Sequence, residues 1–105
     1  MTIANLKSPR SDRPVANQFV AYDGRHTYFQ SYNSLVCTID GNAQTITFGR
    51  DWNYSRTTSK YLRVFMNEYA PRVAFEWSTR YINDIIREGA FVDDFGRLWT
   101  IYTEA

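Results

Sequence analysis

Polar and apolar positions alternate between residues 18 and 48 in the way that is typical of short β-strands joined by tight turns. Asp23-Gly24 and Asp40-Gly41-Asn42 each separate two such runs, and both are strong hairpin signals. A third turn is expected at Tyr32-Asn33-Ser34. The pattern therefore predicts a four-stranded antiparallel meander, with strands at 19–22, 27–31, 35–39 and 43–48.

The register of this meander follows from keeping the apolar side chains together, because a one-residue slip turns a strand's apolar set to the other face. A two-residue turn at Gly41-Asn42 places Cys37 opposite Ile46. A symmetric turn before the third strand also brings Phe29 opposite Cys37. The expected core face of the sheet holds Phe29, Leu35, Cys37, Ile39, Ile46 and Phe48.

The opposite face of the predicted sheet is only half apolar. It carries Tyr28, Gln30, Tyr32, Val36, Thr38, Thr45 and Thr47. An antiparallel sheet can leave one face to solvent, so we expect this face to stay open.

Two helices are predicted after the meander. The first is capped by Thr57 or Thr58, runs to about Tyr69 and is ended by Pro71. Its apolar stripe at helical spacing consists of Leu62, Phe65, Met66 and Tyr69. The second helix begins near Ser78 and runs to Glu88, and Gly89 is a natural residue for its end.

The chain closes with Phe91-Val92, a turn at residues 93–96, and a strand at 98–103. Strands, two helices and further strands indicate an α+β fold, an antiparallel β-meander of four to six strands with two α-helices packed on one face. Residues 1–17 are rich in Ser, Pro and Arg and are expected to form a flexible N-terminal arm. Residues 18–105 are then a single domain.

Composition and charge narrow the picture further. The chain has 105 residues with a formal charge of +1, and 17% of them are aromatic, which is an unusually large share. The charge is uneven, because residues 1–63 carry eight basic and four acidic groups, whereas residues 64–105 carry four basic and seven acidic groups. Two differently charged solvated surfaces would explain this, and so would a basic face for an acidic partner.

The single Cys37 and the single His26 exclude an intramolecular disulfide and a zinc site of the usual Cys/His type. No cofactor or metal is implied. The sequence shows no apolar run of signal-peptide or membrane-span length, so we expect a soluble cytoplasmic protein with no membrane contact.

Catalytic motifs are missing from the sequence. There is no phosphate loop, dinucleotide fingerprint, nucleophile elbow or metal-helix motif. Cys37 lies mid-strand on the expected core face, whereas His26 lies beside a turn, so the two cannot act together as nucleophile and base. We therefore expect no catalytic residues and no enzymatic activity.

Binding is better supported than catalysis. Cations and aromatic residues gather within fourteen residues as Arg50, Trp52, Tyr54, Arg56, Lys60 and Arg63. Arginines interleaved with aromatics hold phosphates and stack bases, and the free amides at the start of the helix favour an anion. The alternative is that Trp52 and Tyr54 plug the rim of the core while the cations are solvated.

A protein partner is the other option. Tyr, Trp and Arg are enriched at interface hot spots, and Tyr28 and Tyr32 on the open sheet face would suit that role. The partner would then be a host protein or a nucleoprotein complex, and the oligomeric state is left open.

Residues 29–37, 52–62 and 65–68 combine an SYxS/T turn with the pattern WxYSxTTxKxLxxF. In this combination the chain resembles a family of small uncharacterised proteins from bacteriophages and mobile elements. The family's usual histidine after the lysine is Tyr61 here, which weakens any idea of shared catalysis. The resemblance implies a phage context, in which small proteins often inhibit host machinery, anti-CRISPR proteins among them.

Two hypotheses follow. The leading one is a non-enzymatic phage or mobile-element protein that binds and inhibits a host macromolecular complex, such as a nucleic-acid-guided nuclease. The alternative is a small nucleic-acid-binding accessory protein that uses the Arg/aromatic surface around residues 50–63.

Overall fold

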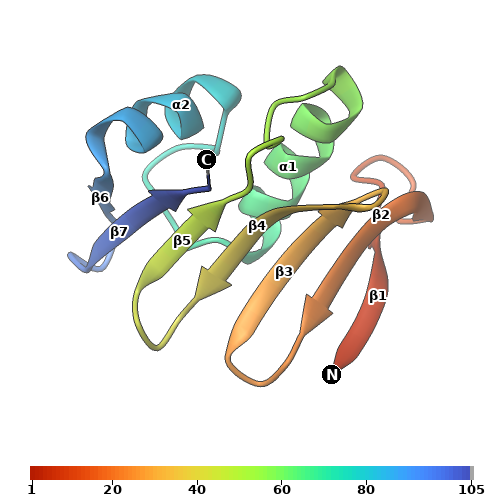
Figure 1. The fold of residues 1–105 in the computed structure, drawn as a ribbon, viewed down its shortest axis with the longest axis horizontal. Helices are drawn as coiled ribbons and strands as arrows, with labels where there is room; N and C mark the ends of the chain where they lie inside the picture. Colours follow the sequence, from red (N-terminus) through yellow and green to blue (C-terminus); the bar gives the residue numbers. More distant parts are fainter. Residues whose placement is uncertain (105) are drawn as a thin grey trace.

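A single seven-stranded sheet and two helices make up residues 1–104, the part of the chain that the computed structural model describes (Figure 1). The elements in chain order are β1 Thr2–Lys7, β2 Pro14–Tyr22, β3 His26–Ser31, β4 Ser34–Asp40, β5 Thr45–Phe48, α1 Arg56–Tyr69, α2 Thr79–Glu88, β6 Ala90–Val92 and β7 Leu98–Thr103. The order across the sheet is β1-β2-β3-β4-β5-β7-β6. Among the strand pairs of residues 1–104, only β5 and β7 are parallel. The predicted α+β class and the meander are confirmed, with seven strands rather than four to six.

The register of β4 against β5 differs from the expected one by two residues. Phe29 does pair with Cys37, as predicted, but Cys37 pairs with Phe48 and Asp40 pairs with Thr45. The connecting turn therefore has four residues, because the Asp40 carboxylate accepts hydrogen bonds from two backbone N–H groups of a longer loop. A shift of two residues keeps the same faces, so the apolar residues of β5 still lie in the core.

A β-bulge in β4 overturns the prediction for Leu35 and Val36. Gln30 pairs with Leu35 and Phe29 with Cys37, so Val36 is the extra residue between them. Val36 is fully buried, whereas Leu35 is 47% exposed on the open face. Gly49 explains the bulge, because its N–H donates to the Val36 carbonyl at 2.7 Å and a Cβ there would overlap the Leu35 carbonyl oxygen.

Residues 1–17, which were expected to form an arm, belong to the sheet instead. They supply β1 and the first part of β2, and these two strands pair antiparallel from Thr2 opposite Tyr22 to Lys7 opposite Pro14. Leu6 is only 1% exposed and joins the core. The N-terminal segment is therefore the edge of the domain.

The helices begin and end close to the expected residues. Ser55 caps α1 by accepting the Thr58 N–H at 3.1 Å, so neither Thr57 nor Thr58 is the cap. Ser78 caps α2, and Gly89 ends it at a φ of 80°, as its position in the sequence predicted.

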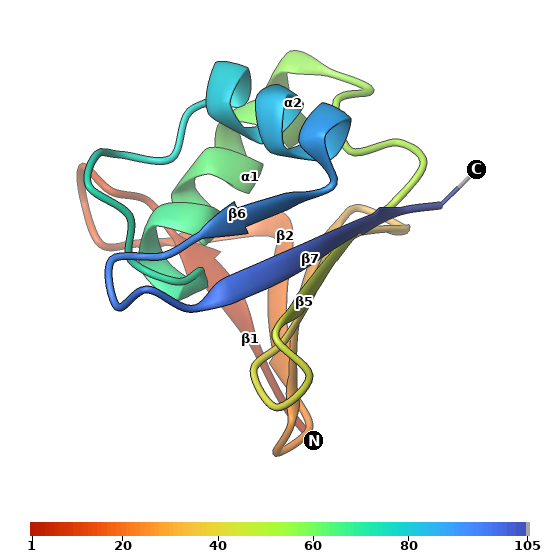
Figure 2. The same ribbon diagram turned by 90° about the vertical axis from the view of Figure 1, so that its left-hand side faces the viewer.

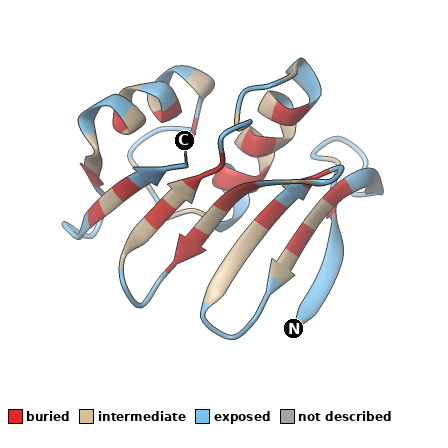
Figure 3. Cartoon of the chain, in the orientation of Figure 1, coloured by how far each residue is buried: buried red, intermediate tan, exposed pale blue. Residues whose placement is uncertain are grey.

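Both helices lie on the same side of the sheet in Figure 2. The ring of Phe65 in α1 stacks on Phe29 of β3 with centroids 5.3 Å apart, and Tyr81 of α2 meets Phe91 of β6 edge-on. Figure 3 shows the resulting alternation of buried and exposed positions along the strands. Neither helix of residues 1–104 covers the opposite side of the sheet. Neither of the two helices found in residues 1–104 is long and apolar enough to cross a membrane.

Candidate nucleic-acid interface at the helix N-termini

Four of the eight predicted binding residues line one cleft at the N-terminal end of α1. The cleft has a volume of about 620 Å³ and is lined by Tyr54, Arg56, Lys60 and Arg63, together with Asn53, Ser55, Ser59 and Thr79. Three of these residues are cations, several carry hydroxyl groups, and none carries a carboxylate. The lining therefore suits an anion.

The N-termini of both helices contribute to this basic cleft. Residues 55–59 begin α1, and Thr79 begins α2. The Arg63 guanidinium donates from Nη1 to the Thr79 hydroxyl at 2.8 Å, which holds the two ends together. Neither helix has an acidic residue in its first turn. Two positive dipole ends thus add to the three positive side chains.

The cations of the basic cleft have no acidic partners. Within residues 1–104, none of the ion pairs includes Arg50, Arg56, Lys60 or Arg63. Arg56 and Lys60 are four residues apart on α1, where like charges repel each other, and both lie near the positive end of the helix dipole. This arrangement costs helix stability, and a bound anion would offset that cost.

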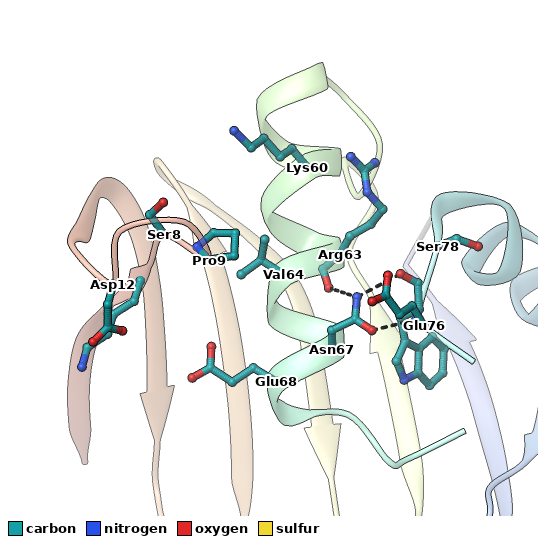
Figure 4. A pocket seen from close by; sticks show the side chains of 12 residues that line it. Ser8, Pro9, Asp12, Lys60, Arg63, Val64, Asn67, Glu68, Glu76 and Ser78 are labelled. Carbon is teal, nitrogen blue, oxygen red and sulfur yellow. Dashed lines mark hydrogen bonds between the residues drawn. The ribbon is translucent and has the colours of Figure 1, made fainter. Parts of the chain in front are cut away.

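A second, larger groove runs along the outer side of α1 and shares Lys60 and Arg63 with the basic cleft (Figure 4). It has a volume of about 740 Å³ and lies between the β1–β2 turn and the segment 76–78. Glu68 and Glu76 line it beyond Arg63, so its charge is mixed. The part whose charged lining residues are all cations is therefore the end at the helix N-termini.

The aromatic residues that were predicted to bind differ in how exposed they are. Tyr54 is 81% exposed, and Tyr32 is also exposed. Trp52 is half-buried and packs against Phe48 with ring centroids 6.2 Å apart. The alternative that this residue plugs the rim of the core is therefore correct for Trp52. Arg50 is exposed and lies outside the basic cleft.

Tyr28 lies on the open sheet face, apart from the basic cleft. It lines a hollow of about 430 Å³ together with Met1, Ile3, Phe19, Ala21, Gln30 and Leu35, which we call the apolar hollow. The Tyr28 hydroxyl donates to the Asp23 carboxylate at 2.8 Å, and this hydrogen bond raises the pKa of Tyr28. The eight predicted binding residues therefore do not form one surface: four line the basic cleft, Tyr28 lies on the open sheet face, Trp52 packs on the core, and Arg50 and Tyr32 lie outside both the cleft and the hollow.

The expectation that Cys37 is a core residue is confirmed. Cys37 is 1% exposed, its thiol lies 3.9 Å from the Met66 sulfur, and burial raises the pKa of the thiol strongly. His26 instead lies within 3.3 Å of both Asp23 and Asp40, at the end of the sheet. Among the residues described, no group of three or more His, Cys, Asp and Glu side chains is arranged to hold a metal ion.

Four residues that line the basic cleft were not predicted: Asn53, Ser55, Ser59 and Thr79. Ser55 is the cap of α1, where Thr57 or Thr58 was expected, and Thr79 comes from a helix that begins sixteen residues after Arg63. The signals for both were the serines that precede the two helices, because Ser is a favoured cap. Nothing in the sequence showed that the two helix ends meet.

No curated protein and no solved structure matches the chain. Residues 1–76 match the family described as "Family of unknown function (DUF8033)". The matched range spans β1 to β5, all of α1 and the three cations of the basic cleft, and it ends before α2. The chain therefore belongs to this family of unknown function.

Proposed function

We propose that the protein is a non-enzymatic, small nucleic-acid-binding protein that holds the phosphates of a single strand in the basic cleft. The observation that carries this proposal is the lining of the cleft, with three cations, hydroxyl groups, two helix N-termini and no carboxylate. Phosphate contacts by Arg, by hydroxyls and by helix N-termini are the usual source of affinity for nucleic acids.

The spacing of the cations favours a polyanion over a small anion. Arg56, Lys60 and Arg63 span eight residues of α1, a rise of about 10 Å along the helix. They extend along a line and can therefore contact successive phosphates. Tyr54, exposed beside them, supplies a ring on which a base can stack.

The test measures binding of fluorescently labelled 20-nucleotide single-stranded DNA and RNA by anisotropy at several salt concentrations. Arg56→Glu combined with Lys60→Glu is expected to weaken binding strongly and to lower the salt slope by at least about 1.4, or roughly 0.7 for each lost contact. The matched control is Arg72→Glu with Arg87→Glu, which makes the same charge change at the opposite ends of the helices. Equal losses in both double variants, or no binding at low salt, would overturn the proposal.

A second candidate function is inhibition of a host macromolecular complex, as the resemblance to phage proteins suggests. The observation that favours it is the apolar hollow, where Ile3 is 65% and Leu35 47% exposed. Exposed apolar patches of this kind often mark protein interfaces.

Capture from host lysates followed by mass spectrometry separates the two candidates. A host complex should be lost with Ile3→Asp and Leu35→Asp but retained with Arg56→Glu and Lys60→Glu. The opposite pattern would show that capture runs through nucleic acid in the basic cleft, and it would count against the second candidate.

A further inference from the structure

A small pocket adjoins the basic cleft and shares Tyr54 and Ser55 with it. The pocket has a volume of about 210 Å³, below the range of roughly 300–1,000 Å³ that is typical of sites for drug-sized ligands. Its size therefore suits a single ring system. We call it the hydroxyl pocket, because Ser31, Ser34, Ser55 and Thr58 line it, together with two tyrosines and Asp51.

The floor of the hydroxyl pocket is fixed by hydrogen bonds. The Thr58 hydroxyl lies 3.2 Å from both the Ser31 and the Ser55 hydroxyls, and Ser31 and Thr58 are buried. Gln18 lies directly opposite Ser31 on β2, and its amide holds the only buried side-chain polar atoms without a partner in residues 1–104. This corner of the core thus has more unused hydrogen-bonding capacity than the rest of it.

Asp51 and two tyrosines form the accessible part of the hydroxyl pocket. The Asp51 side chain is exposed and makes no hydrogen bond or ion pair with the rest of the described chain. Tyr32 and Tyr54 are both exposed, and neither ring contacts another aromatic ring in residues 1–104. A carboxylate and two aromatic rings therefore remain free to contact a ligand.

Tyr32 is held in an unfavourable backbone conformation. Its φ is 54°, which is uncommon for a residue other than glycine. Its N–H donates to the Asn17 carbonyl at 2.7 Å, and its carbonyl accepts from the Gln30 amide at 2.8 Å. Tyr32 begins the two-residue turn between β3 and β4, where a positive φ is usual, and these bonds fix its backbone beside the hydroxyl pocket.

We propose that the hydroxyl pocket takes one guanine base of a single-stranded nucleic acid whose adjacent phosphate lies in the basic cleft. This inference rests on the proposed function. Guanine presents two neighbouring donors, N1–H and the N2 amino group, which a carboxylate such as Asp51 accepts together. Adenine, cytosine and thymine each present an acceptor beside their donor, which a carboxylate repels. Tyr32 and Tyr54 supply stacking surfaces for the base.

The test compares labelled heptamers of deoxythymidine that carry a single central dG, dA, dC or dT. The dG heptamer is expected to bind tighter than the other three by roughly tenfold or more, as for one bidentate base contact. Asp51→Asn is expected to bring the ratio of the dG to the dT heptamer affinity down to about one, a comparison that does not depend on how much the lost negative charge strengthens the binding of every heptamer. The matched control is Asp94→Asn, an exposed acid in the β6–β7 turn, which should keep the preference.

The possible failures are distinguishable. Equal binding of all four heptamers, or a guanine preference that survives Asp51→Asn, would overturn the guanine pocket and leave the proposed function standing. Absence of binding by every heptamer and by the 20-nucleotide strands would overturn both. Because Asp51 makes no side-chain contact that the fold needs, Asp51→Asn is expected to fold, and circular dichroism checks this.

Discussion

The two faces of the sheet differ most clearly at two neighbouring residues of β3. Phe29 points toward the helices, is fully buried and stacks on Phe65. Tyr28, next to it in the sequence, points to the open face and uses its hydroxyl on Asp23. The face toward the helices therefore contains the buried core, whereas the open face carries polar groups and the apolar hollow at the surface.

This difference separates the residues that stabilise the fold from those that remain accessible at the surface. The covered face contains the buried side chains that stabilise the fold. The basic cleft lies at the end of the helix layer, and its cations make no ion pairs within the described chain. Substitutions in the cleft or on the open face should therefore change binding far more than folding, and those on the covered face should do the reverse.

The largest expected effect is that of Phe29→Ala. Removing this ring leaves a cavity against Phe65 and should lower the free energy of unfolding by about 3–5 kcal/mol. The control on the same strand is Gln30→Ala on the open face, which should cost less than about 1 kcal/mol. Denaturant unfolding measures both. Similar losses for the two variants would mean that the faces do not differ as described.

Lowering the pH is expected to have the next largest effect on the free energy of unfolding, because three aspartates in turns become protonated together. Asp23, Asp40 and Asp93 each accept two backbone N–H groups of their own turn. These bonds lower the pKa of Asp23 and Asp40, chiefly through the His26 N–H and the Ala43 N–H. For Asp93, burial acts to raise the pKa. The hydrogen bonds from its turn and from the Trp99 indole outweigh this, so the pKa of Asp93 is lowered.

The sign of the pH dependence follows from these lowered pKa values. The stabilisation is present above the ordinary aspartate pKa of about 3.9 and is lost as the pH falls through the folded values. Unfolding free energy should therefore fall below about pH 5, and Asp40→Asn should flatten that fall. Asp94→Asn is the control. An unchanged pH profile in Asp40→Asn would show that the turn carboxylate does not stabilise the fold.

The bulge in β4 gives a third, smaller contrast between the faces. Val36→Ala removes two buried carbon groups and should cost about 2 kcal/mol, at roughly 0.8 kcal/mol for each plus a cavity term. Leu35→Ala, one residue earlier on the open face, should change stability by about 0.5 kcal/mol or less. If the regular alternation of the sequence were correct, Leu35→Ala would be the more damaging of the two.

These residues also show how far sequence reasoning reaches. The Asp-Gly turns allowed the strands of the meander to be predicted well, because the residues that form such a turn are adjacent in the sequence. The bulge depends on Gly49, which approaches Leu35 only after the chain has turned back, so the alternation placed Leu35 in the core. Strand β1 escaped notice because Leu6 is its one buried residue, and a single position shows no period.

The same limit applies to the candidate site. Tyr54, Arg56, Lys60 and Arg63 could be found because they are close in sequence and share a helix start. Thr79 and the N-terminus of α2 join them only through tertiary packing, which no local pattern encodes. Trp52 lies in the same segment yet packs against Phe48, so nearness in sequence alone does not decide which aromatic residues line the basic cleft.

The smallest predicted effect concerns Ser55, where the covered face meets the basic cleft. Its hydroxyl accepts the Thr58 N–H, so Ser55→Ala should cost about 1 kcal/mol as a lost helix cap. Thr57→Ala is the control, since Thr57 is exposed and makes no side-chain hydrogen bond within the described chain. Urea unfolding separates the two variants. A larger loss for Thr57→Ala would restore the threonine as the cap, and it would move the start of α1 away from the cleft that the proposed phosphate contacts require.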